Sequence, residues 1–242
     1  MDRPVRNVRH GPGPQHGLGF TLIEVLVALS IVAIMAVLSW RGIDAMARGQ
    51  QAVAAYTDEM LALQAGLSQW RADLDAIVSW DIESQPGAST VQSGAVQSLS
   101  WDGRLLRLSR QDSSGAAAGL RVVAWLQRPA DGQWLRWQSG PVQSQYAWQA
   151  AWDAAARWGE SDGRSSSAAG EAVAIAQLQD WQLHYFRRNA WTHPLSSQAE
   201  ANETASAVPD GIRLFLTLAP DQALSGAMQI DWVRPDFGGR RP

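Results

Sequence analysis

The feature that most constrains this chain is an apolar run close to its N-terminus. Residues 20–40 read FTLIEVLVALSIVAIMAVLSW, and Glu24 carries the only charged side chain among them. A helix rises about 1.5 Å per residue, so this run is about 30 Å long, the thickness of the hydrocarbon core of a bilayer. The sequence therefore predicts a transmembrane helix at residues 20–40.

Residues 1–19 form a polar leader ahead of this run. The leader contains Arg3, Arg6 and Arg9 but only one acidic residue, Asp2. Positive charge beside a membrane span is retained on the cytoplasmic side. We therefore expect a single-pass protein with a cytoplasmic N-terminus and with its C-terminal body on the opposite side.

The apolar run has two ordinary interpretations, a cleaved secretory signal and an unprocessed signal anchor. A cleaved secretory signal fits the Ala45-Met46-Ala47 sequence, but the apolar run is longer than the 7–15 residues of such signals. An unprocessed signal anchor fits the length of the run. Neither accounts for Glu24, because a carboxylate at the centre of a membrane helix costs about 2.5–3.5 kcal/mol.

Cleavage between Gly19 and Phe20 would account for Glu24. The new α-amine of Phe20 would be positive, and Glu24 lies four residues later, one helical turn away. The helix dipole also favours an anion in the first turn. Within one molecule this pairing makes Glu24 tolerable. Between molecules it would fix the axial register of neighbouring helices, because an unpaired buried charge costs several kcal/mol.

These residues resemble a known processing signal. The sequence from Gly19 to Val25, GFTLIEV, is similar to the class III signal of type IV pilins and type II secretion pseudopilins. That signal has a basic leader ending in Gly, Phe at the first mature position, Glu at the fifth and an uninterrupted apolar helix. The resemblance implies cleavage after Gly19 by a prepilin peptidase, N-methylation of Phe20 and a role for Glu24 in subunit docking.

The helical pattern continues beyond the apolar run. Residues 41–80 are predicted to form an amphipathic continuation ending near Trp80, and we expect its apolar stripe to pack on the protein's own sheet. A coiled coil with a partner is the alternative. Asp73 and Asp75, two residues apart, do not face each other, and we place both on a solvated face. The stripe comprises Val53, Tyr56, Met60, Leu63, Leu67, Trp70, Leu74 and Ile77.

Residues 81–242 are predicted to form an antiparallel β domain with long loops. Two-residue turns at Asp102-Gly103 and Asp131-Gly132 predict hairpins, and residues 139–170 and 189–210 are expected to be loops. The fold class is therefore α+β and pilin-like: a long N-terminal helix, transmembrane in its first half, packed on an antiparallel sheet. The predicted strands cover residues 96–101, 104–109, 120–127, 133–138, 173–178, 181–187, 212–218 and 228–232.

The body of the chain is similar to the J-type minor pseudopilins of type II secretion. The similarity lies in the segments LALQAGLSQWRADLDAIV, LRVVAWLQR, QWLRWQ, LQDWQLHYFRRNAWTHPL and GIRLFLTL. It implies a subunit of the pseudopilus tip, anchored in the inner membrane with a periplasmic domain, that helps export folded proteins across the outer membrane. The implied partners are the I- and K-type minor pseudopilins, the major pseudopilin, the assembly platform and the prepilin peptidase.

Two other kinds of protein remain as alternatives. A minor pilin of a type IV pilus would act in adhesion, twitching or DNA uptake, but many such pilins close a C-terminal disulfide loop, and this chain has no cysteine. An unprocessed, membrane-anchored periplasmic binding domain would keep its leader. The state of the N-terminus therefore separates the second alternative from the pilin-like proteins.

Composition excludes several kinds of chemistry. The chain has no cysteine and no lysine, which removes disulfides, thiolate zinc sites, a thiol nucleophile, a Schiff-base lysine and a P-loop lysine. A net charge of −3 argues against nucleic-acid binding, and thirteen tryptophans predict a core built on large aromatic side chains. We expect no enzyme activity, cofactor or metal.

Asp153, Glu160, Asp162 and Glu171 could offer oxygen ligands to Ca²⁺, but they lack the spacing of an EF-hand loop. We expect His184 to be packed or hydrogen-bonded rather than to act as a base. We expect Trp134 and Trp137 to lie in the core or an interface rather than to form ligand platforms.

Overall fold

The computed structural model describes residues 19–78, 97–112, 119–164, 170–199 and 208–235. The chain divides into two compact units, residues 1–53 and residues 54–242. The first helix, α1 (Leu22–Asp75), contributes residues to both units. The sequence also predicts a break rich in Gly, Pro, Ser and Gln at residues 84–95, and this segment lies outside the described residues.

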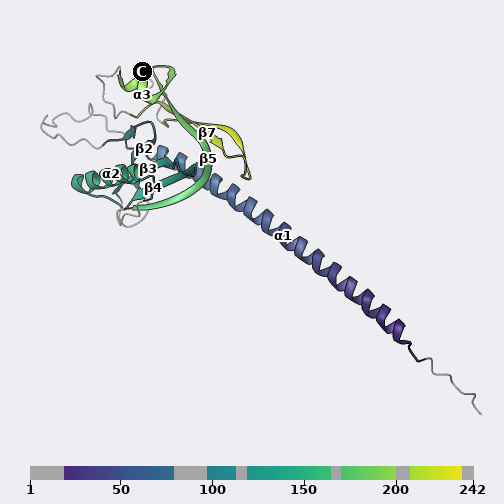
Figure 1. Ribbon diagram of the computed structural model, residues 1–242. Coiled ribbons are helices and arrows are strands. Elements are labelled where there is room, and N and C mark those ends of the chain that lie inside the picture. The colour runs from purple at the N-terminus through teal and green to yellow at the C-terminus, as the bar shows by residue number, and fades with distance from the viewer. Residues whose placement is uncertain (1–18, 79–96, 113–118, 165–169, 200–207, 236–242) are drawn as a thin grey trace, which may run out of the picture. The chain divides into compact units, whose positions relative to one another are not determined.

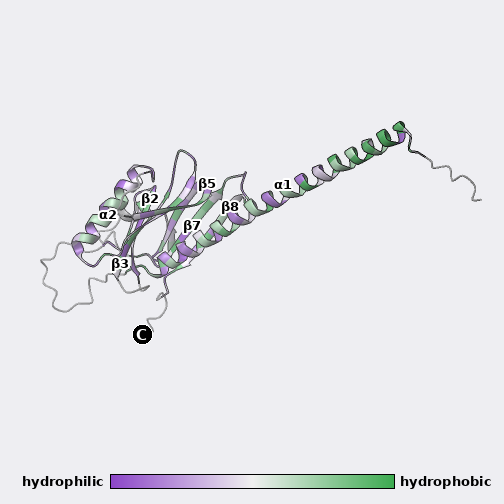
Figure 2. Ribbon diagram, turned by 90° about the horizontal axis from the view of Figure 1, so that it is seen from below, coloured by the Kyte–Doolittle hydropathy of each residue, from purple (hydrophilic) through white to green (hydrophobic). Residues whose placement is uncertain are grey.

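In the first unit the described chain is helical from Leu22 onward, and its side chains are exposed throughout. An 18-residue window of α1 reaches a mean hydropathy of 2.7, and the N-terminal turns of the helix are strongly apolar (Figure 2). Within the described residues, α1 is the one helix long and apolar enough to span a bilayer, which fits a single-pass membrane anchor.

The second unit is built on an antiparallel sheet with the strand order β1-β2-β3-β4-β5-β7-β8, in which β6 pairs with β5 (Figure 1). Long helix followed by antiparallel sheet is the α+β, pilin-like plan that the sequence predicted. The elements after α1 are β1 (Leu99–Trp101), β2 (Leu105–Asp112), β3 (Gly119–Gln127), β4 (Gln133–Ser139), α2 (Gln145–Glu160), β5 (Gly170–Arg187), β6 (Ala190–Thr192), α3 (Pro194–Ala199), β7 (Gly211–Leu218) and β8 (Gly226–Val233).

Strand β5 joins two half-sheets, the first made of β1 to β4 and the second made of β7 and β8. Its residues up to Gln177 pair with β4, and its residues from Leu178 onward pair with β7. The sequence predicted two strands here, at 173–178 and 181–187, whereas the structure has one strand with a register shift between Leu178 and Asp180. The predicted gap therefore coincides with the irregularity at which β5 changes partners.

Helices cover both faces of the first half-sheet. Val123 and Trp125 of β3 belong to the core cluster that includes the end of α1, whereas Val122, Ala124 and Leu126 belong to the cluster that includes α2. Successive strand residues point to opposite faces, so both faces of β3 are buried. Figure 1 shows α2 lying against β2, β3 and β4.

Tryptophans form the centre of the core beneath α1. Trp70 of α1 packs edge-on against Trp125 at a centroid distance of 5.2 Å and against Trp181 at 6.5 Å. Trp134 lies 4.7 Å from Trp125, and Trp101 lies 5.0 Å from Trp181. These five tryptophans are buried, which confirms the prediction of a core built on large aromatic side chains. Their edge-on pairs add to the stability that burial alone provides.

The predicted loop at 139–170 is wrong. It contains α2, a helix whose N-cap, Ser144, accepts a hydrogen bond from the amide of Ala147. The Ala- and Ser-rich composition is typical of a loop, but the buried residues of this segment recur at helical spacing. They are Trp148, Ala151, Trp152, Ala155 and Trp158. The predicted loop at 189–210 is also wrong in part, because it contains β6 and α3.

The end of α1 also differs from the prediction. The helix ends at Asp75 rather than near Trp80. The amide of Val78 then donates to Ser109 O at 3.0 Å, and Gln111 donates to Ala76 O at 2.8 Å, so the backbone after Asp75 joins β2. The packed stripe is also shorter than predicted, because Tyr56 remains exposed.

Candidate processing and docking site

The predicted cleavage site lies immediately before the first turn of α1. Gly19 and Phe20 are both exposed and precede the helix, which begins at Leu22. The Phe20 side chain is 80% exposed. A Cβ built on Gly19 would meet no atom within 4 Å. The bond between Gly19 and Phe20 is therefore in non-helical, accessible backbone, as a peptidase substrate must be.

Thr21 caps the helix on which Glu24 lies. The amide of Glu24 donates to Thr21 Oγ1 at 3.3 Å and to Thr21 O at 3.1 Å. The spacing Thr-x-x-Glu is that of a capping box, in which the cap and the acidic residue satisfy amides that the helix leaves unpaired. The cap fixes Glu24 in the first turn, where the helix dipole favours its negative charge.

Glu24 lies at the exposed apolar end of α1. Its neighbours Ile23 and Leu26 are 72% and 60% exposed, and among the described residues its carboxylate makes no ion pair. A cation one turn away exists only if Phe20 becomes the N-terminus. The Glu24 carboxylate thus lies one helical turn from Phe20, whose α-amine would become a positively charged N-terminus after cleavage.

A second polar site lies at the other end of α1, where the sequence predicted only a solvated face. Asp73 is completely buried, so the predicted solvated face is wrong for this residue. Arg136 of β4 donates to both of its oxygens at 2.8 Å, and Arg110 of β2 donates at 2.6 Å. Trp125 Nε1 and Gln69 Nε2 also donate to it, at 3.0 and 2.8 Å. This network connects α1 to three strands.

Asp75 makes the corresponding contact with the second half-sheet. It is exposed, as predicted, and its Oδ1 accepts a hydrogen bond from Trp232 Nε1 of β8 at 2.7 Å. The prediction that Asp73 and Asp75 do not face each other is confirmed, since they bind different strands. Spacing could have identified Asp73, because it lies three residues after Trp70 on the buried stripe.

The acidic residues considered for Ca²⁺ are spread over separate elements. Asp153 and Glu160 lie on α2, Glu171 lies on β5, and Asp162 forms an ion pair with Arg104 at 3.1 Å. In the described part of the chain, no three His, Asp or Glu side chains form a group that could hold a metal.

His184 and the two tryptophans lie in packed surroundings, as predicted. His184 packs edge-on against Phe215 and His193, at centroid distances of 5.3 and 6.1 Å. Burial, and then the charges of His193 and Arg213, lower the pKa of His184. Trp134 and Trp137 are almost fully buried in the core.

Comparison with known proteins supports the N-terminal signal. Residues 18–40 match the family model of the prokaryotic N-terminal methylation motif. The chain therefore carries a prepilin-type methylation motif, and the matched range includes Gly19, Phe20 and Glu24, whose individual roles remain predictions.

Among curated proteins no match was found. Among solved structures, one chain of the GspK-GspI-GspJ complex from the enterotoxigenic Escherichia coli type 2 secretion system is similar, with a TM-score of 0.42 and 14% identity. The similarity covers 72% of this chain and 96% of that chain.

Proposed function

We propose that this chain is a J-type minor pseudopilin, a structural subunit of the pseudopilus tip in a type II secretion system. The observation that carries the proposal is the methylation motif at residues 18–40, with Glu24 in the first turn of an exposed apolar helix. The antiparallel domain after the helix and the resemblance of its strand segments to J-type subunits add support. The subunit itself has no catalytic role in this proposal.

The proposed sequence of events begins with insertion of the precursor into the inner membrane, with the leader on the cytoplasmic side. Prepilin peptidase cleaves after Gly19 and the amine of Phe20 is methylated. The mature chain remains in the inner membrane through α1, with its β domain in the periplasm. Glu24 then pairs with the N-terminal amine of a neighbouring subunit as the helix leaves the membrane, because both charges are poorly solvated there.

The proposed partners share this processing signal. They are the I- and K-type minor pseudopilins and the major pseudopilin, which an inner-membrane assembly platform adds to the growing pseudopilus. A minor pilin of a type IV pilus is the alternative, since the methylation motif is common to both. Deleting the gene separates them: loss of exoprotein secretion supports the pseudopilin, and loss of pilus-dependent adhesion, twitching or DNA uptake supports the pilin.

Mass spectrometry of the N-terminus of the membrane-extracted chain tests the processing. We expect it to begin at N-methylated Phe20, and a bulky replacement, Gly19→Leu, to leave the leader attached. Ala47→Leu serves as the control, because it removes a small residue that the competing Ala45-Met46-Ala47 site requires and should leave cleavage after Gly19 unchanged. A mature chain that begins at Met1, or beyond residue 40, would contradict the proposal.

A further inference from the structure

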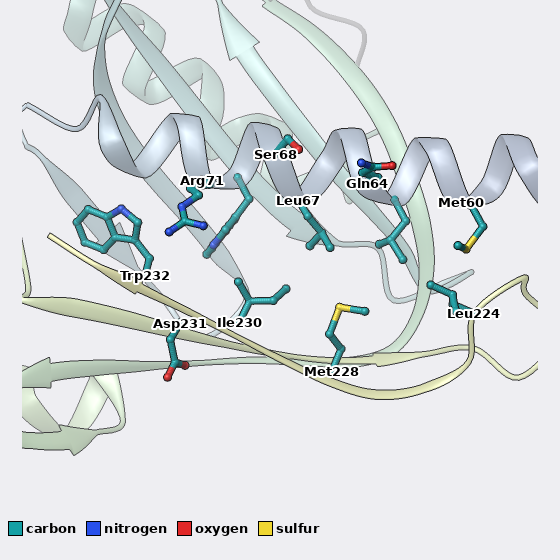
Figure 3. A pocket seen from close by; sticks show the side chains of 12 residues that line it. Met60, Gln64, Leu67, Ser68, Arg71, Leu224, Met228, Ile230, Asp231 and Trp232 are labelled. Carbon is teal, nitrogen blue, oxygen red and sulfur yellow. The ribbon is translucent and has the colours of Figure 1, made fainter. Parts of the chain in front are cut away.

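An apolar groove runs between α1 and strand β8 in the second unit. Its volume is about 450 Å³, and Met228 and Ile230 point into it from β8 while Leu67 points into it from α1 (Figure 3). The apolar part of its lining consists of Met60, Leu63, Leu67, Trp70, Leu224, Met228, Ile230 and Trp232.

Hydrogen bonds hold the groove at both ends. Glu59 Oε2 accepts the amide of Ala223 at 2.8 Å, and Asp75 Oδ1 accepts Trp232 Nε1 at 2.7 Å. The helix between these contacts is about 24 Å long. α1 and the segment leading through β8 are therefore joined at both ends of the groove, which we call the slot.

One wall of this slot is an open sheet edge. β8 is the last strand in the sheet order, and in the described part of the chain only β7 pairs with it. The opposite edge of the sheet is β1, which has three residues, whereas β8 has eight. The unpaired backbone of a long edge strand is a template for another strand.

The charges around the slot are unequal. Arg71 lines it, is exposed and makes no ion pair with any described residue. Asp231 points away from α1 and is held by Arg213, whose Nε and Nη2 donate to it at 2.8 and 2.7 Å (Figure 3).

The lining also includes the polar residues Gln64 and Ser68, and Arg71 is the one cation among the described residues that line the slot. It lies at the Trp232 end, where the nearby Asp75 carboxylate is already bound to Trp232 Nε1.

We infer that this slot receives an extended segment of a different subunit, which pairs with the free edge of β8. Alternate side chains of an added strand point to one face, so apolar residues two apart would enter between α1 and β8. A carboxylate near one end of the segment would meet Arg71. The inference rests on the proposed function for the presence of neighbouring subunits.

A second copy of this chain fits the slot less well. In β8 the side chains alternate, and Asp231 lies on the face opposite to Met228 and Ile230. Pairing two β8 edges about a twofold axis at Ile230 would place apolar residues in each slot but no carboxylate near Arg71. Charge complementarity therefore favours another protein.

Photo-crosslinking of the full chain in its own membranes tests the inference. The photoreactive amino acid p-benzoylphenylalanine replaces Met228 or, separately, Leu67, and mass spectrometry identifies the crosslinked residues. We expect both positions to react with one segment of another subunit, at residues two apart. Crosslinked residues three or four apart would show a docked helix and overturn the inference, as would adducts with lipid or a second copy.

Charge reversal provides the matched control. Arg71→Glu should lower the crosslinking yield about tenfold, the size expected for an opposed charge pair. Arg157→Glu makes the same change on an exposed face of α2 and should leave the yield unchanged. Equal yields from the two variants would overturn the role of Arg71. A chain that begins at Phe20 yet gives no adduct from either position would overturn the strand inference while leaving the proposed function intact.

Discussion

Asp73 and Arg136 form a bidentate ion pair in the interior of the second unit. Nε and Nη2 of Arg136 each donate to a different oxygen of Asp73 at 2.8 Å, and neither side chain is more than 9% exposed. The pair joins α1 to β4. A buried carboxylate needs this many donors, because an unpaired charge in the interior costs several kcal/mol.

The first prediction concerns this ion pair. Asp73→Asn removes the negative charge and leaves Arg136 and Arg110 beside each other without it. We expect the free energy of unfolding of the β domain to fall by about 3–5 kcal/mol, the cost of breaking a buried pair. Urea denaturation of the full chain in detergent, monitored by tryptophan fluorescence, measures this free energy of unfolding.

Asp75→Asn is the control for this substitution. It lies on the same helix and retains an oxygen that can accept the hydrogen bond from Trp232 Nε1. We therefore expect a loss of at most about 1 kcal/mol. Equal losses from the two substitutions would mean that the network around Asp73 contributes no more to the free energy of unfolding than one surface hydrogen bond does.

The second prediction concerns the contact between α1 and β5 at Gly66. A Cβ on Gly66 would lie 2.2 Å from Cγ2 of Ile175. Alanine normally stabilises a helix by about 1 kcal/mol relative to glycine. Here we expect Gly66→Ala to lower the free energy of unfolding by about 1–3 kcal/mol, because the added methyl overfills the interface.

A second glycine and a double variant test this explanation. Gly49→Ala meets no atom within 4 Å and should show only the helical preference for alanine. Ile175→Ala removes the obstructing methyl, so it should make Gly66→Ala nearly neutral when the two are combined. If the double variant loses the full sum of the two single effects, Gly66 is required for some other reason.

The sequence predicted much of this fold because its strongest signals are local. The apolar run, the Asp102-Gly103 and Asp131-Gly132 turns and the alternation at residues 212–218 specify their structures within a few residues. The partners of Asp73 could not be predicted, because spacing on a helix indicates which residues share a face but not which strands cover that face. Arg136 and Arg110 are distant in sequence, and only the folded sheet brings them to Asp73.

The loops were mispredicted for a related reason. The composition of residues 139–170 predicted a loop, yet three tryptophans of α2 have a packing surface on β3 and β4. Burial against a sheet stabilises a helix whose own sequence preference is modest. That sheet forms from strands both before and after α2, so no local window contains the information.

The third prediction concerns the dependence of stability on pH. The pKa of His184 is lowered in the folded chain by burial and by the charges of His193 and Arg213. The unfolded chain therefore binds a proton more readily, so stability is fully present above about pH 6.5 and falls as pH drops through the lower folded pKa. The loss should be under about 1 kcal/mol, because His184 is only partly buried and solvent screens its charge.

Thermal unfolding between pH 8 and pH 5 measures this effect. We expect His184→Gln to flatten the decline in melting temperature, because glutamine does not titrate. His193→Gln should flatten it less, since it removes only one of the neighbouring charges. A decline of the same size in wild type and His184→Gln would assign the pH dependence to other groups.

The fourth prediction concerns Glu24 and the assembly that it is proposed to direct. Glu24→Val removes the only charge in the apolar run, so insertion of α1 should be intact or improved. The amine of Phe20 in a neighbouring subunit would lose its counter-charge, and we expect incorporation into assemblies to fall at least about tenfold. Membrane fractionation measures insertion, and crosslinking to neighbouring subunits measures incorporation.

Thr21→Val separates docking from helix capping. This variant removes the hydroxyl that accepts the amide of Glu24 but retains the carboxylate. A lost cap costs about 1 kcal/mol of helix stability, so Thr21→Val should reduce incorporation far less than Glu24→Val does. Because both substitutions affect the same first turn, equal defects would assign the effect of Glu24 to capping, and normal incorporation of Glu24→Val would remove its docking role.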